Sequence, residues 1–184
     1  MEKKLFYWGK LSKKKIAEIA KHITDNCHKY HLVIVAGPSS SGKTTFTNKL
    51  AIALEVNGKK PIIISMDDYY LNRDQTPLGP DGEPDFEAVD AIDIPLFQKD
   101  LESLISGTTI PVPSFNFKTG MREYRGQLFT KEPGSPIIIE GIHGLNPRLT
   151  NRVPSHLKYM VYVTTLTQLN ILINTITLEC LKHV

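Results

Sequence analysis

Cysteine is scarce in this sequence: there are two in 184 residues, Cys27 and Cys180. Two cysteines cannot build the disulfide framework of a secreted domain, so we expect free thiols and a reducing, cytoplasmic location. No apolar run approaches the roughly 20 residues that a membrane-spanning helix needs, which argues against a membrane protein. The formal net charge of +3 is too small to indicate a nucleic-acid partner.

Size and composition instead indicate an ordinary globular domain. With 41% hydrophobic and 22% charged residues, the chain is long enough to bury one core, and no break in composition marks a second one. Residues 1–28 are expected to form an N-terminal helical segment, since isoleucines recur at helical spacing from Ile16 to Ile23. We therefore predict a single domain over residues 1–184.

Continuous apolar runs predict buried strands, and helical patterns separate them. The runs are residues 32–36, 61–66, 136–141 and 159–163. A further segment, 110–117, alternates like an edge strand, because its prolines cannot donate hydrogen bonds in the centre of a sheet. We predict an α/β fold with a mostly parallel sheet of about five strands and helices on both faces.

The most specific motif stands directly after the first apolar run. Residues 37–45 read Gly-Pro-Ser-Ser-Ser-Gly-Lys-Thr-Thr, the strand–loop–helix pattern of a P-loop. The backbone N–H groups of such a loop cradle phosphates, its lysine (Lys43) reaches the β/γ-phosphates, and its hydroxyl (Thr44) ligates Mg²⁺. The sequence therefore predicts an NTP-binding P-loop protein with ATP and Mg²⁺ as cofactors. The predicted ATP-binding residues are Gly37, Ser39, Ser40, Ser41, Gly42, Lys43, Thr44 and Thr45.

Acidic side chains follow two other predicted strands. Asp67 and Asp68 come after residues 61–66, and Glu140 lies in the run 136–141. Because ligands bind at the carboxyl ends of parallel strands, these carboxylates should face the P-loop. Phosphoryl transfer to a hydroxyl needs Mg²⁺ on the phosphates and a carboxylate that orients and deprotonates the acceptor. We favour these roles, although Asp68 could cap the next turn and Glu140 could pair with a lysine. The residues alone do not choose between Asp67 and Asp68.

Aromatic and arginine side chains cluster in and after the predicted edge strand. Phe115 and Phe117 lie two apart, so their rings share one face, where they either wall a flat base or pack in the core. Arg122 and Arg125 follow, and either contact phosphate or acceptor or stay solvated. Residues 72–90 form a long loop of the kind that usually has a function.

These motifs occur in an order that resembles a known family. The P-loop is followed by Ser-Met-Asp-Asp-Tyr-Tyr at 65–70, Asp-Phe-Glu at 85–87, Pro-Ser-Phe-Asn-Phe at 113–117 and Glu-Gly-Ile at 140–142. This order is similar to that of the uridine kinase/phosphoribulokinase family, and most of all to its bacterial nucleoside-kinase branch. The resemblance covers residues 30–168 and implies a P-loop kinase with a parallel five-stranded core.

The resemblance also implies roles for single residues. Asp67 matches the family's general base, Tyr70 the aromatic beside it, and Glu140 the acid near Mg²⁺. Phe86 and Glu87 fall where uridine kinases hold the ribose with Phe-Asp, so a longer carboxylate replaces the usual one.

Further matches concern the base of the acceptor. Phe115 and Phe117 match an aromatic pair around the base, and Arg122 matches a substrate-side arginine. Gly120 stands where uridine kinases place a base-contacting histidine, so phosphotransfer is implied more firmly than a uridine or cytidine preference. The predicted catalytic residues are Asp67 and Lys43, the metal ligands Thr44 and Glu140, and the substrate-binding residues Tyr70, Phe86, Glu87, Phe115, Phe117 and Arg122.

The end of the sequence departs from the family pattern. Residues 166–184 are an atypical apolar tail in place of the family's charged lid, and the last arginine is Arg152. Such a tail must bury itself in the domain or against a partner, which makes a homo-oligomer plausible. Because lid arginines stabilise the transferring phosphate, we expect turnover lower by a factor of about 10³–10⁵.

The sequence thus predicts an ATP- and Mg²⁺-dependent kinase for the 5′-hydroxyl of a small-molecule nucleoside, with a pyrimidine favoured. One alternative is a kinase for another small alcohol, such as a sugar phosphate or a pantothenate-like acceptor. Another is a nucleotide-binding module that hydrolyses ATP poorly. The acceptor pocket separates them, because a binding module needs no Asp67 beside an aromatic-lined cleft.

Overall fold

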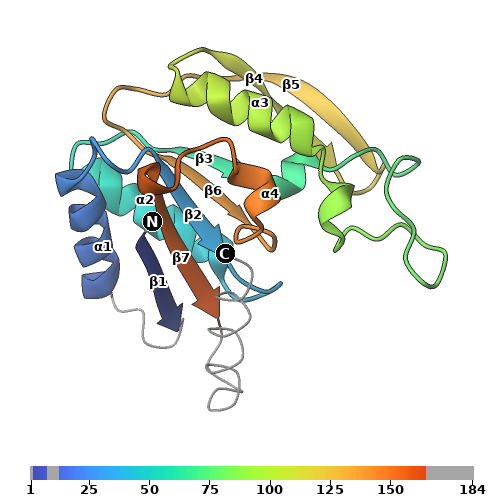
Figure 1. The fold of residues 1–184 in the computed structure, drawn as a ribbon, viewed down its shortest axis with the longest axis horizontal. Coiled ribbons are helices and arrows are strands. Elements are labelled where there is room, and N and C mark those ends of the chain that lie inside the picture. Colours follow the sequence, from blue (N-terminus) through green and yellow to red (C-terminus); the bar gives the residue numbers. More distant parts are fainter. Residues whose placement is uncertain (1, 8–12, 165–184) are drawn as a thin grey trace.

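Figure 1 shows the fold in a computed structural model of the chain. The structure describes residues 2–7 and 13–164. Cys180 and the apolar tail over 166–184 lie outside the described residues. The lid, the oligomer and the lowered turnover expected from that tail therefore stay predictions.

Five parallel strands form the central sheet, in the order β1-β7-β2-β6-β3. Four of these strands are the apolar runs recognised in the sequence. Every residue of β2 and β6 is buried, because both faces of the sheet are covered. The strands are β1 (Glu2–Tyr7), β2 (Leu32–Ala36), β3 (Ile62–Ser65), β6 (Ile137–Gly141) and β7 (Lys158–Thr164).

The fifth strand, β1, corrects the prediction of a helical segment over residues 1–28. Glu2–Tyr7 pairs in parallel with β7, and helix α1 occupies only Lys13–Asp25. The edge of β7 would otherwise present unpaired backbone groups, and a short segment containing aromatic residues satisfies them better as a strand than as a helix.

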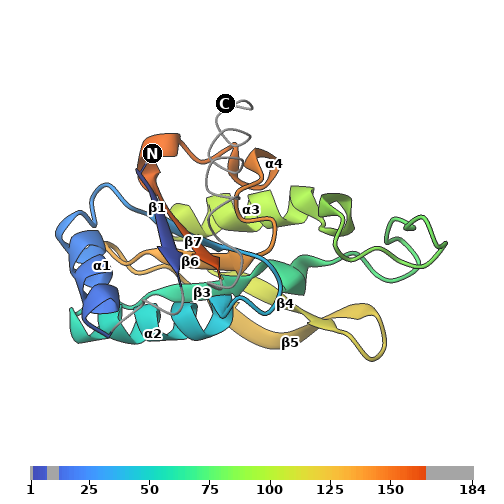
Figure 2. The same ribbon diagram turned by 90° about the horizontal axis from the view of Figure 1, so that it is seen from below.

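Helices cover both faces of the sheet, as predicted. Helices α1 and α2 (Lys43–Val56) lie on one face, and α3 (Ile94–Ile105) and the short α4 (Pro147–Thr150) lie on the other (Figure 2). Successive side chains of β2 alternate between the two cores, with Val33 beside α1 and α2 and Ile34 beside α3. None of the helices in the described part of the chain is long and apolar enough to cross a lipid bilayer.

A separate antiparallel pair, β4 (Ile110–Asn116) and β5 (Met121–Phe129), forms a hairpin. β4 is the segment expected to be an edge strand, and its register shifts between Pro111 and Pro113, where the backbone lacks N–H donors. β5 has no counterpart in the prediction, because its mostly exposed residues lack the alternation that marks a half-buried strand. Short 3₁₀ turns complete the fold: η2 (Met66–Tyr69), η3 (Val89–Ala91) and η4 (Ser155–Leu157).

The carboxylate of Asp93 ties α3 to this hairpin. One oxygen, Oδ1, accepts the N–H of Leu96 at 3.1 Å and caps the start of α3. The other oxygen, Oδ2, pairs with Nη1 of Arg122 in β5 at 2.9 Å, and both side chains are mostly buried. Asp93 therefore makes a polar link between the helix and the hairpin, in addition to their shared apolar core.

Replacing Asp93 should separate these two contributions. Asp93→Ala loses the helix cap and the ion pair, so we expect the free energy of unfolding to fall by about 1–2 kcal/mol. Asp93→Asn keeps a capping oxygen and should lose less. Urea unfolding followed by circular dichroism measures both, and equal losses in the two variants would show that the cap contributes nothing.

Candidate active site

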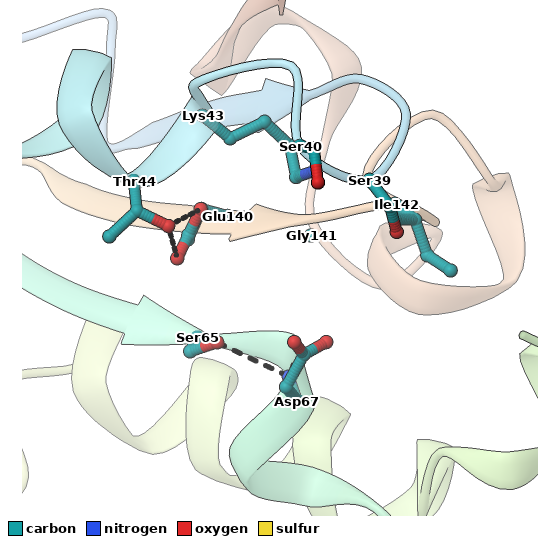
Figure 3. Close-up of a pocket in the computed structure, with 9 residues that line it drawn as sticks. All are labelled: Ser39, Ser40, Lys43, Thr44, Ser65, Asp67, Glu140, Gly141 and Ile142. Atoms are coloured by element: carbon teal, nitrogen blue, oxygen red, sulfur yellow. Dashed lines mark hydrogen bonds between the residues drawn. The ribbon is translucent and has the colours of Figure 1, made fainter. Parts of the chain in front are cut away.

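The carboxyl ends of the neighbouring strands β2, β6 and β3 meet around one cavity of about 210 Å³ (Figure 3). The P-loop and the two acidic strand ends thus come together, as the sequence indicates. The residues lining the cavity are Ser39, Ser40, Lys43, Thr44, Ser65, Asp67, Glu140, Gly141 and Ile142. The other predicted ATP-binding residues belong to the same loop and the first turn of α2: Gly37, Ser41, Gly42 and Thr45.

The P-loop backbone is tightly curled. A Cβ at Gly37 would collide with the carbonyl oxygen of Val163, so only glycine fits there. Ser40 has a φ of 57°, the one positive value at a non-glycine residue in the described part of the chain. Ser41 is 2% exposed, and its hydroxyl has no hydrogen-bond partner among the described residues. A curled backbone and a buried hydroxyl without a partner fit a loop that closes around a phosphate group.

Lys43 begins α2 and reaches back across the loop. Its ammonium donates to the carbonyl oxygen of Pro38 at 2.7 Å. Burial lowers the pKa of Lys43, while the charges of Glu140 and Asp67 act in the opposite direction. A neutral carbonyl is a weaker partner for an ammonium than an anionic oxygen, so a phosphate is expected to take its place.

Thr44 and Glu140 form the part of the cavity that fits a metal ion. The Thr44 hydroxyl donates to the carboxylate, 2.9 Å from Oε1 and 3.1 Å from Oε2. Burial raises the pKa of Glu140, although the Thr44 hydrogen bond and the charge of Lys43 lower it. A hydroxyl with one carboxylate suits Mg²⁺, which usually completes its shell with water and phosphate oxygens. The described residues hold no cluster of three or more His, Cys, Asp or Glu side chains that could cage a metal alone.

The structure distinguishes Asp67 from Asp68, which the sequence could not. Asp67 lines the cavity with its carboxylate directed toward the P-loop, and its N–H donates to the Ser65 hydroxyl at 3.3 Å (Figure 3). Asp68 is not among the lining residues. Its Oδ1 accepts the N–H of Phe115 at 3.2 Å, and burial raises its pKa. Asp68 thus contacts the backbone of β4, and Asp67 is the one of the two aspartates that lines the cavity.

Four aromatic rings pack against one another beside the cavity, with centroids between 5.1 and 6.2 Å apart: Tyr70, Phe86, Phe115 and Phe117. Phe115 is buried, whereas Phe117 is 59% exposed, so one ring of the predicted pair belongs to the core and the other faces solvent. Burial raises the pKa of Tyr70, and the nearby negative charge of Asp67 raises it further. Tyr70 therefore connects these four rings, called the aromatic cluster below, to the cavity.

The charged residues predicted for the acceptor lie outside the cluster. Glu87 is exposed on the long loop, close enough to Tyr70 for its charge to raise the pKa of that hydroxyl. Arg122 pairs with Asp93, as described above, and Arg125 pairs with Glu123 at 3.3 Å. A contact between Arg122 and a substrate would require that it leave Asp93.

Arg73 is a residue of this region that the sequence did not point to. Its side chain lies over Gly120, and a Cβ there would come within 2.8 Å of both Cβ and Nε of Arg73. Gly120 also has a φ of +70°, a conformation that side chains rarely adopt. The structure thus gives a reason why position 120 is glycine, where the family resemblance implied a histidine. No local pattern could have found this contact, because it joins residues 47 positions apart.

Comparison with known proteins identifies the family. The model of the phosphoribulokinase/uridine kinase family matches residues 32–176, which is more than half of the chain. The chain belongs to this family.

Among curated relatives of this family member, a uridine kinase of Deinococcus deserti is 32% identical over 128 residues, covering 69% of this chain and 59% of that protein. A uridine kinase of Macrococcus caseolyticus is 31% identical over 141 residues, covering 77% of this chain and 65% of that protein. The chain therefore spans about 59–65% of the length of these two relatives.

Solved structures confirm the P-loop kinase fold. A possible uridine kinase from Bacillus stearothermophilus matches with a TM-score of 0.58 at 19% identity, covering 79% of this chain and 80% of that one. A possible fructose transport system kinase from a Silicibacter species matches with a TM-score of 0.52 at 21% identity, covering 68% of this chain and 62% of that one.

For this family member, Lys43→Ala should weaken ATP binding by roughly tenfold or more, because the charge-assisted hydrogen bonds of the ammonium are lost. Isothermal titration calorimetry measures the dissociation constant. Lys49→Ala removes an exposed lysine from the same helix and should bind ATP like the wild type. Equal affinities for Lys43→Ala and the wild type would contradict the assignment of the loop.

Proposed function

We propose that this protein is a nucleoside kinase that transfers the γ-phosphoryl group of ATP to the 5′-hydroxyl of a nucleoside. One observation carries the proposal. The carboxylate of Asp67 shares a cavity with the P-loop residues Lys43 and Thr44, and it lies close enough to Tyr70 of the aromatic cluster for its charge to raise the pKa of that hydroxyl. A carboxylate placed between a phosphate-binding loop and a ring-lined surface suits transfer from one ligand to another.

The donor side of the reaction would be held by the P-loop. Its backbone N–H groups and the Lys43 ammonium bind the phosphates, and Thr44 and Glu140 would hold Mg²⁺. Such an ion would supply positive charge that stabilises the transferring phosphoryl group. Asp67 orients the acceptor hydroxyl and takes its proton, and Tyr70 stands close to that carboxylate on the acceptor side.

The acceptor side is formed by the aromatic cluster and the long loop. The exposed ring of Phe117 offers a flat surface on which a base can stack. The exposed carboxylate of Glu87 can accept hydrogen bonds from both the 2′- and 3′-hydroxyls of a ribose. These two features favour a nucleoside over a small alcohol without a base, which would leave the Phe117 ring unused.

Replacing each of the two neighbouring aspartates with asparagine tests the role of Asp67. Asp67→Asn should bind ATP within a few-fold of the wild type but turn over roughly 10² times more slowly or worse, since the amide cannot take the proton. Asp68→Asn keeps an oxygen that can accept the N–H of Phe115, so its turnover should stay near the wild-type value. A coupled assay for ADP with nucleoside present measures both. A large loss in Asp68→Asn with none in Asp67→Asn would reverse the roles and refute the proposal for Asp67.

A further inference from the structure

The five arginines of the chain differ in their partners. Four form ion pairs: Arg122 with Asp93, Arg125 with Glu123, Arg148 with Asp90 and Arg152 with Glu102. Arg73 pairs with no carboxylate in the described part of the chain, and its side chain is exposed. Its guanidinium is therefore the arginine group most available to a ligand.

The position of Arg73 is nevertheless well defined. Its N–H donates to the Gly120 carbonyl at 2.8 Å, and its Nη2 donates to the Phe117 carbonyl at 3.3 Å. The preceding residue, Asn72, accepts the N–H of Arg122 at 2.9 Å through its side-chain oxygen. The long loop is thus fastened to the turn of the β4–β5 hairpin, and the guanidinium sits at that junction.

This junction lies at the rim of the aromatic cluster. Phe117, whose carbonyl holds the guanidinium, has its ring 5.1 Å from the ring of Phe115 and 6.2 Å from that of Tyr70. The carbonyl oxygen that accepts from Arg73 and the exposed ring belong to the same residue, Phe117, so the guanidinium and the ring are neighbours at this rim. A guanidinium carries five N–H donors and no acceptor, and Arg73 gives one of them to Phe117.

We propose that Arg73 selects the base of the acceptor nucleoside, which rests on the function proposed above. Its free N–H groups donate to the exocyclic carbonyl oxygen of a keto base, at position 4 of uracil or position 6 of hypoxanthine and guanine. Cytosine and adenine carry an amino group at the same place, where donor would face donor. The acceptor is therefore a nucleoside whose base carries a carbonyl oxygen at this position, called a keto base here.

Gly120 makes this arrangement available. A side chain at this position would meet the Cβ, Nε and Cζ atoms of Arg73 at 2.8–3.2 Å and displace the guanidinium. Glycine at the hairpin turn and arginine on the loop thus form a matched pair. Other family members that place a side chain at this turn would have to read the base differently.

Steady-state kinetics with uridine, cytidine, inosine and adenosine tests the proposal. The wild type should show kcat/KM values roughly tenfold or more higher for uridine than cytidine, and for inosine than adenosine. Arg73→Ala should bring both ratios toward one by raising KM for the keto nucleosides, with KM for ATP unchanged. Arg125→Ala, which removes an exposed and ion-paired arginine of the neighbouring β4–β5 hairpin, should keep both ratios.

Arg73→Gln supplies a variant with a different expected result. The glutamine amide has a carbonyl oxygen that can accept a hydrogen bond from an amino group. The kcat/KM values for cytidine and adenosine should therefore rise relative to those for uridine and inosine. A role limited to bracing the hairpin would lower activity on all four nucleosides alike and leave the ratios unchanged. This comparison still decides the matter if Arg73→Ala folds poorly.

The outcomes separate this proposal from the one on which it rests. The role of Arg73 would be overturned if the uridine/cytidine and inosine/adenosine ratios of kcat/KM were near one in the wild type, or if neither Arg73 variant changed them. Phosphorylation of nucleosides would still stand. Calorimetry should show uridine binding to the wild type and weaker uridine binding to Arg73→Ala. Tight ATP binding with neither binding nor phosphorylation of any nucleoside would overturn both proposals.

Discussion

All the groups assigned to the chemistry meet because β2, β6 and β3 run parallel and side by side. Their carboxyl ends deliver the P-loop, Glu140 and Asp67 to one edge of the sheet, where the positive end of α2 also lies. The hydrogen bond from Thr44 to Glu140 joins the first helical turn after one strand to the end of its neighbour. Changing the register of any of these strands by one residue would turn its side chains to the other face.

The electrostatics of the cavity follow from this crowding. Burial disfavours the charged forms of both Lys43 and Glu140, and two more carboxylates, Asp67 and Asp68, stand close to Glu140. An anionic phosphate beside Lys43 and a divalent cation beside Glu140 would each restore the charged form that burial opposes. Ligand binding and charge compensation are thus coupled in this site, where the carbonyl oxygen of Pro38 holds the Lys43 ammonium next to the loop.

The sequence predicted those parts of the molecule whose structure is determined by neighbouring residues in the chain. The P-loop is contiguous, and buried parallel strands are continuous apolar runs, so both could be read directly. Asp67 and Asp68 follow the same strand, and only the 3₁₀ turn η2 sends one into the cavity and the other to the backbone of β4. Strand β1 and the contact of Arg73 with Gly120 depend on pairings between distant segments, for which one sequence offers no local pattern.

We propose that the cavity transfers a phosphoryl group between two bound ligands. Incubating the protein with Mg²⁺, uridine and ATP labelled at the γ-phosphorus, and following the label by mass spectrometry, tests it most directly. We expect the label to appear on the 5′-oxygen of the nucleoside and ADP to form much faster when nucleoside is present. Label found only in inorganic phosphate, released at the same rate with and without nucleoside, would contradict it.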